Sequence, residues 1–383
     1  MDVTELKFPR VPAASEGAAG TLFEYGVSEK GAFFMTAEEI RLRRLAGQYL
    51  TAPADKMTVV RGLCGVQAQY MSHAMHALRI RCTDFDPDTA GEGLVKNWSL
   101  RGTMHVFAED ELPLFFALRQ KDDYRSVDWS GETFWNRRDA WALTPERQRF
   151  FSERILGACE TGPRTREELK AVCRAAGMTD AEEDSMFDPW GGGMRELCER
   201  GFLHGAVQEE KRYCLSPPFA PVPPHEAELA LARRYFENYA PATVHDAMYF
   251  FHVPAARVKR WLGELPVQTA ECGGKTYFYI ETGRKLDENM PECLFLAGFD
   301  QLMLGYEKKE SLFLAQERLR EIFTLSGIVM PAVLVNGQAA ERWKMKNGRL
   351  SVSLFAPPGK RKKAAIRETA ERLWNDLSAV EFV

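Results

Sequence analysis

The stretch Leu63-Cys64-Gly65-Val66-Gln67-Ala68-Gln69-Tyr70 follows an apolar, helix-like run and carries two glutamines separated by one residue, just past the expected helix end. Further along, Trp98-Ser99-Leu100-Arg101-Gly102-Thr103-Met104-His105-Val106 contains an Arg-Gly turn between two short β-prone runs, which predicts a tight hairpin. Several side chains of this hairpin could touch a phosphate. We interpret the first stretch as a reaction centre and the second as part of the scaffold that presents it.

Helices are expected on both sides of the reaction centre. Thr36-Ala37-Glu38-Glu39 predicts a capping box, because the threonine hydroxyl can accept from the Glu39 amide while the Glu39 side chain reaches back. Apolar residues at helical spacing follow over 40–50, and a shorter helix is expected over 58–66. Residues 73–82 can form helix or strand, and residues 94–98 are expected to end a further helix. Helix, helix and hairpin in this order is the plan of a winged helix.

The same order of elements recurs twice without a clear repeat of sequence. The expected groups of helices, each followed by a hairpin, cover 145–200 with 202–215 and 225–263 with 267–280. The end of the chain differs, because two Asn-Gly turns at 336–337 and 347–348 separate alternating runs and predict hairpins. A basic amphipathic helix is expected from about Lys360 to Leu377.

We therefore predict an α+β fold, mostly α, with three tandem winged-helix (helix-turn-helix) units and a small C-terminal β-barrel or sheet closed by a helix. The predicted boundaries are 1–35 for an N-terminal extension, 36–140 for the unit with the Gln-x-Gln motif, 141–222 and 223–290 for the second and third units, and 291–383 for the C-terminal part.

Composition restricts the function. The 383-residue chain is long for one core, and its net charge of −4 leaves only a local basic face for nucleic acid. The eight cysteines are spread singly without a Cys-x-x-Cys pair, so neither zinc nor another metal or cofactor is expected. No apolar run approaches a membrane span and no signal peptide is evident, so we expect no membrane contact and a cytoplasmic location.

Each candidate site residue can be interpreted as structural or as functional. From spacing alone, Gln67 and Gln69 are more simply read as capping a helix end than as catalytic. Arg101 is either a surface turn arginine or a phosphate contact, and Thr103 in the same hairpin is a further candidate for contact with DNA. His105 alternates within a strand, where a satisfied structural histidine is more common than a functional one.

Three further side chains are candidates for contact with nucleic acid. Tyr70 is either a core or lid aromatic or a stacking platform for a base. His73 could line a channel, and its i, i+3 spacing to His76 is not a metal site without a third ligand. Lys362 belongs to the basic run 360–363, which could hold a DNA backbone but is more often a solvated charge run.

Four segments together resemble the winged-helix DNA glycosylases of the AlkZ/YcaQ-like superfamily, over about residues 36–380. These segments are Val66-Gln67-Ala68-Gln69, Trp98 with Arg101-Gly102-Thr103-Met104-His105, Phe299-Asp300 with Leu304-Gly305-Tyr306, and Pro331 to Gly337 with Trp343. The resemblance implies tandem winged helices and a β-barrel around a DNA channel. It also implies release of N7-alkylated purines, with unhooking of interstrand crosslinks, and catalysis by the motif that Gln67 and Gln69 match.

Two amides suit this chemistry. A purine alkylated at N7 is already cationic and leaves as a neutral base, so the general acid of an ordinary glycosidase is not required. Gln67 and Gln69 would jointly position the water, with Gln69 closer to the sugar. The motif holds no lysine, so we predict a monofunctional enzyme without a lyase step. We expect it to act as a monomer on duplex DNA carrying alkylated purines, in association with the nucleoid.

Two other functions remain open at this point. A non-catalytic winged-helix DNA-binding protein or transcriptional regulator would bind one sequence tightly without releasing a base. A scaffold that has lost DNA binding would show no salt-dependent affinity for any duplex.

Overall fold

The computed structural model describes residues 33–117, 140–189, 191–287, 289–355 and 359–383. The predicted N-terminal extension therefore lies almost entirely outside the described residues. Helix α1 (Ala37–Gly47) begins at Thr36, whose hydroxyl accepts from the Glu39 amide at 3.1 Å, and the Glu39 carboxylate accepts from the Thr36 amide, which confirms the capping box. Helix α2 (Lys56–Gly62), strand β1 (Val66–Gln67) and helix α3 (Met71–Arg79) follow.

The expectation of a helix ending at Trp98 is wrong. Residues Leu94–Trp98 form strand β2, which pairs along its whole length with β3 (Met104–Ala108), and the short helical turn η1 (Leu100–Gly102) joins the two strands. Pairing with β3 decides this outcome. The local preference of this run for helix or strand is weak, and the ladder with β3 supplies its backbone hydrogen bonds. The turn η2 (Glu109–Glu111) and helix α4 (Leu112–Ala117) complete this part.

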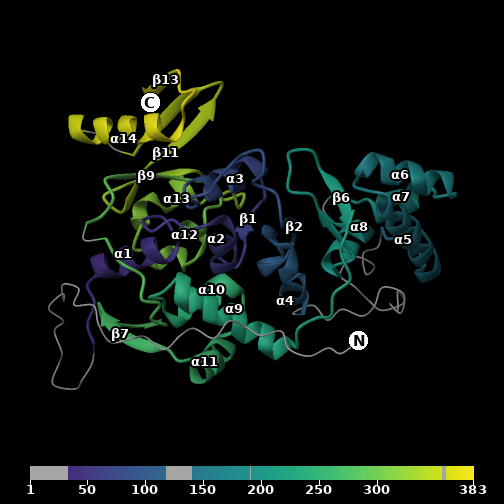
Figure 1. Cartoon of the computed structure of the whole chain (residues 1–383), viewed down its shortest axis with the longest axis horizontal. Coiled ribbons are helices and arrows are strands. Elements are labelled where there is room, and N and C mark those ends of the chain that lie inside the picture. The colour runs from purple at the N-terminus through teal and green to yellow at the C-terminus, as the bar shows by residue number, and fades with distance from the viewer. Residues whose placement is uncertain (1–32, 118–139, 190, 288, 356–358) are drawn as a thin grey trace.

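The second segment contains helices α5 (Pro145–Glu160), α6 (Arg166–Ala175), α7 (Asp180–Met186) and α8 (Gly192–Glu199), with strands β4 (Arg164–Thr165), β5 (Leu203–Gly205) and β6 (Arg212–Leu215). Its helices have a core of their own, and Figure 1 shows them grouped to the right of β2. Helix α7 was not predicted from the sequence. Its capping box at Thr179 starts it, although its seven residues are mostly polar.

The hairpins of the first two segments belong to one six-stranded sheet, in the order β1-β3-β2-β5-β6-β4. A single residue pair, Lys96 with Gly205, joins them through the backbone. The buried side chain of Asn97 reinforces this junction, since its Nδ2 donates to the carbonyl oxygens of Cys198 and Leu203 at 3.0 Å each. The two segments are therefore held in a defined relation.

The third segment packs behind the first. It contains α9 (Pro224–Asn238), α10 (Val244–Phe251), α11 (Ala255–Glu264) and the hairpin of β7 (Gln268–Cys272) with β8 (Lys275–Tyr279), and it shares one hydrophobic core with α1 to α4. The buried Tyr239 hydroxyl donates to the carbonyl oxygen of Leu63 at 2.8 Å. The stretch that carries the glutamines is thus held by the residue that ends α9, which lies 176 positions away in the sequence.

The C-terminal part is an open sheet and not a barrel. Its five strands have the order β13-β12-β11-β10-β9, and among the described residues the edge strands β9 and β13 do not pair with each other. Helix α14 (Lys360–Leu373) covers one face of the sheet, and its residues Ile366 and Ala370 pack in a core with Trp343. The apolar face of the sheet is therefore buried by a helix, and the sheet does not close into a barrel. The strands are β9 (Cys293–Leu296), β10 (Ala332–Val335), β11 (Gln338–Lys346), β12 (Arg349–Leu354) and β13 (Ala379–Phe382).

Short helical segments connect these strands, namely α12 (Gln301–Leu304), η3 (Lys308–Glu310), η4 (Gln316–Arg318) and α13 (Leu319–Ile322). Asp300, in the Phe-Asp motif, is fully buried and accepts from Arg81 at 2.6 and 3.0 Å. This pair ties the end of α3 to the C-terminal part, so Asp300 has a structural role. Among the described residues, no helix combines the length and the apolar character needed to cross a membrane.

Candidate nucleic-acid interface and reaction centre

A sharp reversal of the backbone places the two glutamines. Cys64 and Gly65, directly after α2, have φ angles of 55° and 84°, and a Cβ atom on Gly65 would lie 3.1 Å from the Val106 carbonyl oxygen. Because the chain turns back here, Val66 and Gln67 pair with Val106 and His105 of β3. Gln67 is therefore a strand residue, and Gln69 lies in the link to α3, so the interpretation of these residues as helix caps does not fit the backbone.

The two glutamines have different environments. Gln67 is 6% exposed, and its Oε1 accepts from Arg101 Nη2 at 3.0 Å. Gln69 is exposed and lines a cavity of about 470 Å³. The sequence suggested that both amides position one water, with Gln69 closer to the sugar. The structure adds that the Gln67 amide is held by a cation, whereas the Gln69 amide is exposed at the surface.

Arg101 points into the protein. Its Nη1 donates to the Phe250 carbonyl oxygen of α10 at 3.1 Å, and its guanidinium lies 4.9 Å from the Phe250 ring centre. Burial lowers the pKa of Arg101. Both terminal nitrogens of the guanidinium are thus used within the protein, whereas the sequence predicted either a surface turn arginine or a phosphate contact.

His105 is the neighbour of this contact. It is 1% exposed, and its Nδ1 lies 3.1 Å from the Thr103 carbonyl oxygen while its Nε2 lies 3.3 Å from Arg101 Nη2. Burial, and then the charge of Arg101, lower the pKa of His105 to about 3. A neutral ring that donates from Nδ1 and accepts at Nε2 satisfies both contacts, so His105 is placed as a structural histidine.

The cavity beside Gln69 is a basic cleft between the first two segments, and we refer to it as the basic cleft. The first hairpin contributes Trp98 and Thr103 to its wall, and the second segment contributes Tyr213. Among the described lining residues Asp188 is the one carboxylate, and the cations are Lys96, Arg166, Arg195, Lys211 and Arg212. An overall acidic protein thus has the local basic face that nucleic-acid binding would require.

Two lysines of the basic cleft are available to an anion. Arg195 pairs with Glu199 at 3.1 Å and Arg212 pairs with Glu210 at 2.6 Å, but neither Lys96 nor Lys211 has a carboxylate partner within the described residues. Burial and the positive charge of Lys211 lower the pKa of Lys96. A bound phosphate would relieve this repulsion. Sequence reasoning missed these residues, because separate segments bring them together only in the fold.

The remaining predicted residues lie outside the basic cleft. Tyr70 is 50% exposed at the start of α3, with its ring 6.0 Å from that of Phe299 and 5.8 Å from that of His73. His73 is half-buried against Gly298, where an added Cβ would lie 2.8 Å from its Nε2, and burial lowers its pKa. Lys362 forms an ion pair with the buried Glu341 of β11.

Comparison with known proteins identifies the class. The family model described as "DNA glycosylase AlkZ-like" matches residues 60–375, and the chain therefore belongs to the AlkZ-like DNA glycosylase family. The resemblance seen in the four motifs is thus confirmed.

Two relatives place the chain within this family. It is 26% identical over 337 residues to a protein of Streptomyces sahachiroi named interstrand DNA cross-link repair glycosylase, covering 82% of this chain and 88% of that one. The solved structure of Streptomyces sahachiroi DNA glycosylase AlkZ is similar with a TM-score of 0.73 at 22% identity, over 91% of this chain and 100% of that chain. The structural similarity shows a shared fold.

Proposed function

We propose that this protein is a monofunctional DNA glycosylase that hydrolyses the N-glycosidic bond of N7-alkylated purines, including purines joined in interstrand crosslinks. The observation that carries the proposal is the position of Gln69, an exposed amide on the wall of the basic cleft, with Gln67 held close by in β1. The name of the Streptomyces sahachiroi relative, an interstrand DNA cross-link repair glycosylase, supports the crosslink part.

The chemistry of the cleft suits a substrate that leaves readily. A glycosidase acting on a neutral leaving group uses two carboxyl groups, and the described lining of the basic cleft contains only Asp188. A cationic N7-alkylpurine needs no protonation, so the remaining tasks are to place a water and to stabilise a sugar cation. The Gln69 carbonyl can accept a hydrogen bond from that water and turn its dipole towards the positive charge on the sugar.

The basic cleft is proposed as the path of the DNA backbone next to the lesion. Lys96 and Lys211 would contact phosphates, and Thr103 would reach a phosphate by turning its hydroxyl away from the Leu100 carbonyl oxygen, to which it donates at 3.2 Å. The repeated helix, helix and hairpin order supports three winged helices arranged along the duplex. An open cleft would admit bulky adducts that a tight base-flipping pocket excludes.

The test uses a duplex with one N7-methylguanine, followed by alkaline cleavage at abasic sites. Q67A, Q69A and the double variant are expected to lose excision while keeping the wild-type circular dichroism spectrum. Q208A is the matched control, since Gln208 also lines the basic cleft but lies outside the motif. Wild-type activity in the folded double variant would overturn the catalytic assignment.

A second experiment tests the absence of a lyase step. Lys96 lines the same cleft as Gln69, so borohydride trapping on abasic DNA is informative. We expect no trapped complex and no β-elimination product. A trapped complex that disappears in K96R would show a bifunctional enzyme instead.

A further inference from the structure

The geometry around Arg101 points to a further assignment: Arg101 is a positioning residue that fixes the orientation of the Gln67 amide, and it is not a phosphate contact. This inference rests on the proposed catalytic role of the two glutamines.

The contacts determine which end of the Gln67 amide faces inward. A guanidinium only donates hydrogen bonds, so the group 3.0 Å from Arg101 Nη2 must be the amide oxygen and not the NH₂ group. Arg101 itself is held by the Phe250 carbonyl oxygen at 3.1 Å and by the neutral His105 ring at 3.3 Å. A rotation of the Gln67 amide would place two donors against each other.

This orientation makes the two glutamines chemically different. With Oε1 engaged, Gln67 has its Nε2 donors left, and among the described residues Nε2 neither has a hydrogen-bond partner nor is sealed from solvent. A charge-assisted bond to the oxygen polarises the amide and strengthens its N–H donors. Gln67 is thus prepared to donate to the substrate or its water, while Gln69 keeps a free carbonyl as the acceptor.

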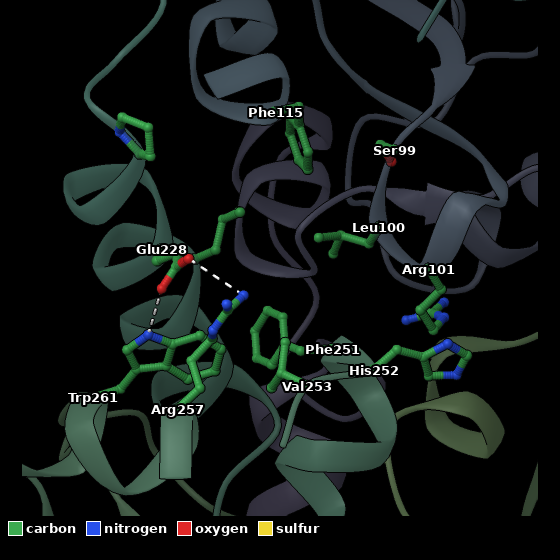
Figure 2. Close-up of a pocket in the computed structure, with 12 residues that line it drawn as sticks. Ser99, Leu100, Arg101, Phe115, Glu228, Phe251, His252, Val253, Arg257 and Trp261 are labelled. Atoms are coloured by element: carbon green, nitrogen blue, oxygen red, sulfur yellow. Dashed lines mark hydrogen bonds and ion pairs between the residues drawn. The ribbon is translucent and has the colours of Figure 1, made fainter. Parts of the chain in front are cut away.

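The backbone supports a specific role for Arg101. Its φ of 57° lies in the left-handed region, where an arginine is strained and a glycine would not be. Figure 2 shows Arg101 beside His252, at one end of a cavity of about 350 Å³ that Arg257 and Trp261 line at the other end. His252 has a φ of 53°. The Arg101 side chain therefore also borders a cavity on the side of α10 and α11.

A double-mutant cycle tests the assignment. If Arg101 acts through Gln67, the rate losses of the two single variants will not multiply in the double variant. Excision is measured under single-turnover conditions, with enzyme in saturating excess over a duplex carrying one N7-methylguanine, for R101A, Q67A and R101A/Q67A. A displaced catalytic group costs about 100-fold in rate. We expect R101A and Q67A each to slow the reaction to this extent, and the double variant to be no slower than the slower single variant.

Binding measurements separate positioning from phosphate contact. A lost phosphate contact lowers the slope of log affinity against log salt by about 0.9. We expect R101A to keep the wild-type affinity and slope. Multiplied rate losses in the double variant, or a lowered slope with an unchanged rate at saturation, would overturn the inference.

Two variants guard against a purely structural effect. R101K keeps the positive charge but lacks the two guanidinium nitrogens that donate to Phe250 and Gln67, so we expect it to be as slow as R101A. A wild-type rate in R101K would also refute the assignment. R257M alters the same cavity away from Gln67 and should keep the wild-type rate. Methylguanidinium should restore part of the rate in R101A and none in Q67A. If Q67A is itself fully active, the proposed function fails before the role of Arg101 is tested.

Discussion

Replacing Lys96 and Lys211 together by methionine tests whether the basic cleft carries DNA. Both side chains line the cleft, and neither forms an ion pair with a carboxylate within the described residues, so each should contribute a charge to the binding of a duplex. With about 0.9 units of salt slope per phosphate contact, K96M/K211M should lower the slope by about 1.8. Over the fourfold range from 50 to 200 mM salt, the affinity of the wild type should therefore fall about twelvefold more than that of the variant.

The assay is fluorescence anisotropy with an undamaged duplex over this salt range. K259M is the matched control, because Lys259 is exposed on α11 and does not line the basic cleft. A pH series adds an independent check. Lys96 carries its full charge below its pKa, which burial and Lys211 lower. The affinity should therefore stay constant at low pH and should fall, with uptake of a proton on binding, once the pH rises through that pKa. Equal salt slopes in the variant and the wild type would refute the assignment of the cleft.

Three further predictions concern stability. N97A should lower the free energy of unfolding by about 1–3 kcal/mol in urea titrations, because the Cys198 and Leu203 carbonyl oxygens lose their donor; an unchanged midpoint would contradict this role. R81M should cost about 3–5 kcal/mol, since it leaves Asp300 buried without its cation; a thermal melt close to that of the wild type would contradict it. The pKa of His105 is lowered to about 3, so its contribution to stability is complete above the ordinary histidine pKa and is lost as the pH falls from there towards 3; H105Q should flatten the acid branch of the stability curve.

Acidic substitutions at Gln67 and Gln69 should have different effects on excision, because the two amides have different partners. Two equivalent amides would both accept hydrogen bonds from one water. In the structure the Gln67 oxygen accepts from Arg101, and in the proposed mechanism this would divide the donor and acceptor functions between Gln67 and Gln69. This division predicts that Q67E and Q69E behave differently. An acid at 67 would pair with Arg101 and lose the N–H donors, whereas an acid at 69 would keep an acceptor for the water.

Local signals were sufficient for many elements. The capping box at Thr36 and the α5 start at Pro145 formed as expected, since both depend on residues three or four positions apart. The Asn336-Gly337 turn has φ angles of 48° and 71°, which are the two positive values that a type I′ hairpin requires. Strand β2 was assigned wrongly, because its partner β3 and not its own sequence decides its conformation.

The sequence by itself determined the Gln-x-Gln motif, the capped helices, the Asn-Gly hairpins and, through these motifs, the family. Only the tertiary structure decided that Arg101 turns inward to Gln67, that Lys96 and Lys211 share a cleft, and that the C-terminal strands form an open sheet. The physical reason is the range of the interactions. A cap or turn is made within a few residues, whereas Arg101 reaches the carbonyl oxygen of a residue 149 positions away, and such contacts exist only after separate segments have packed together.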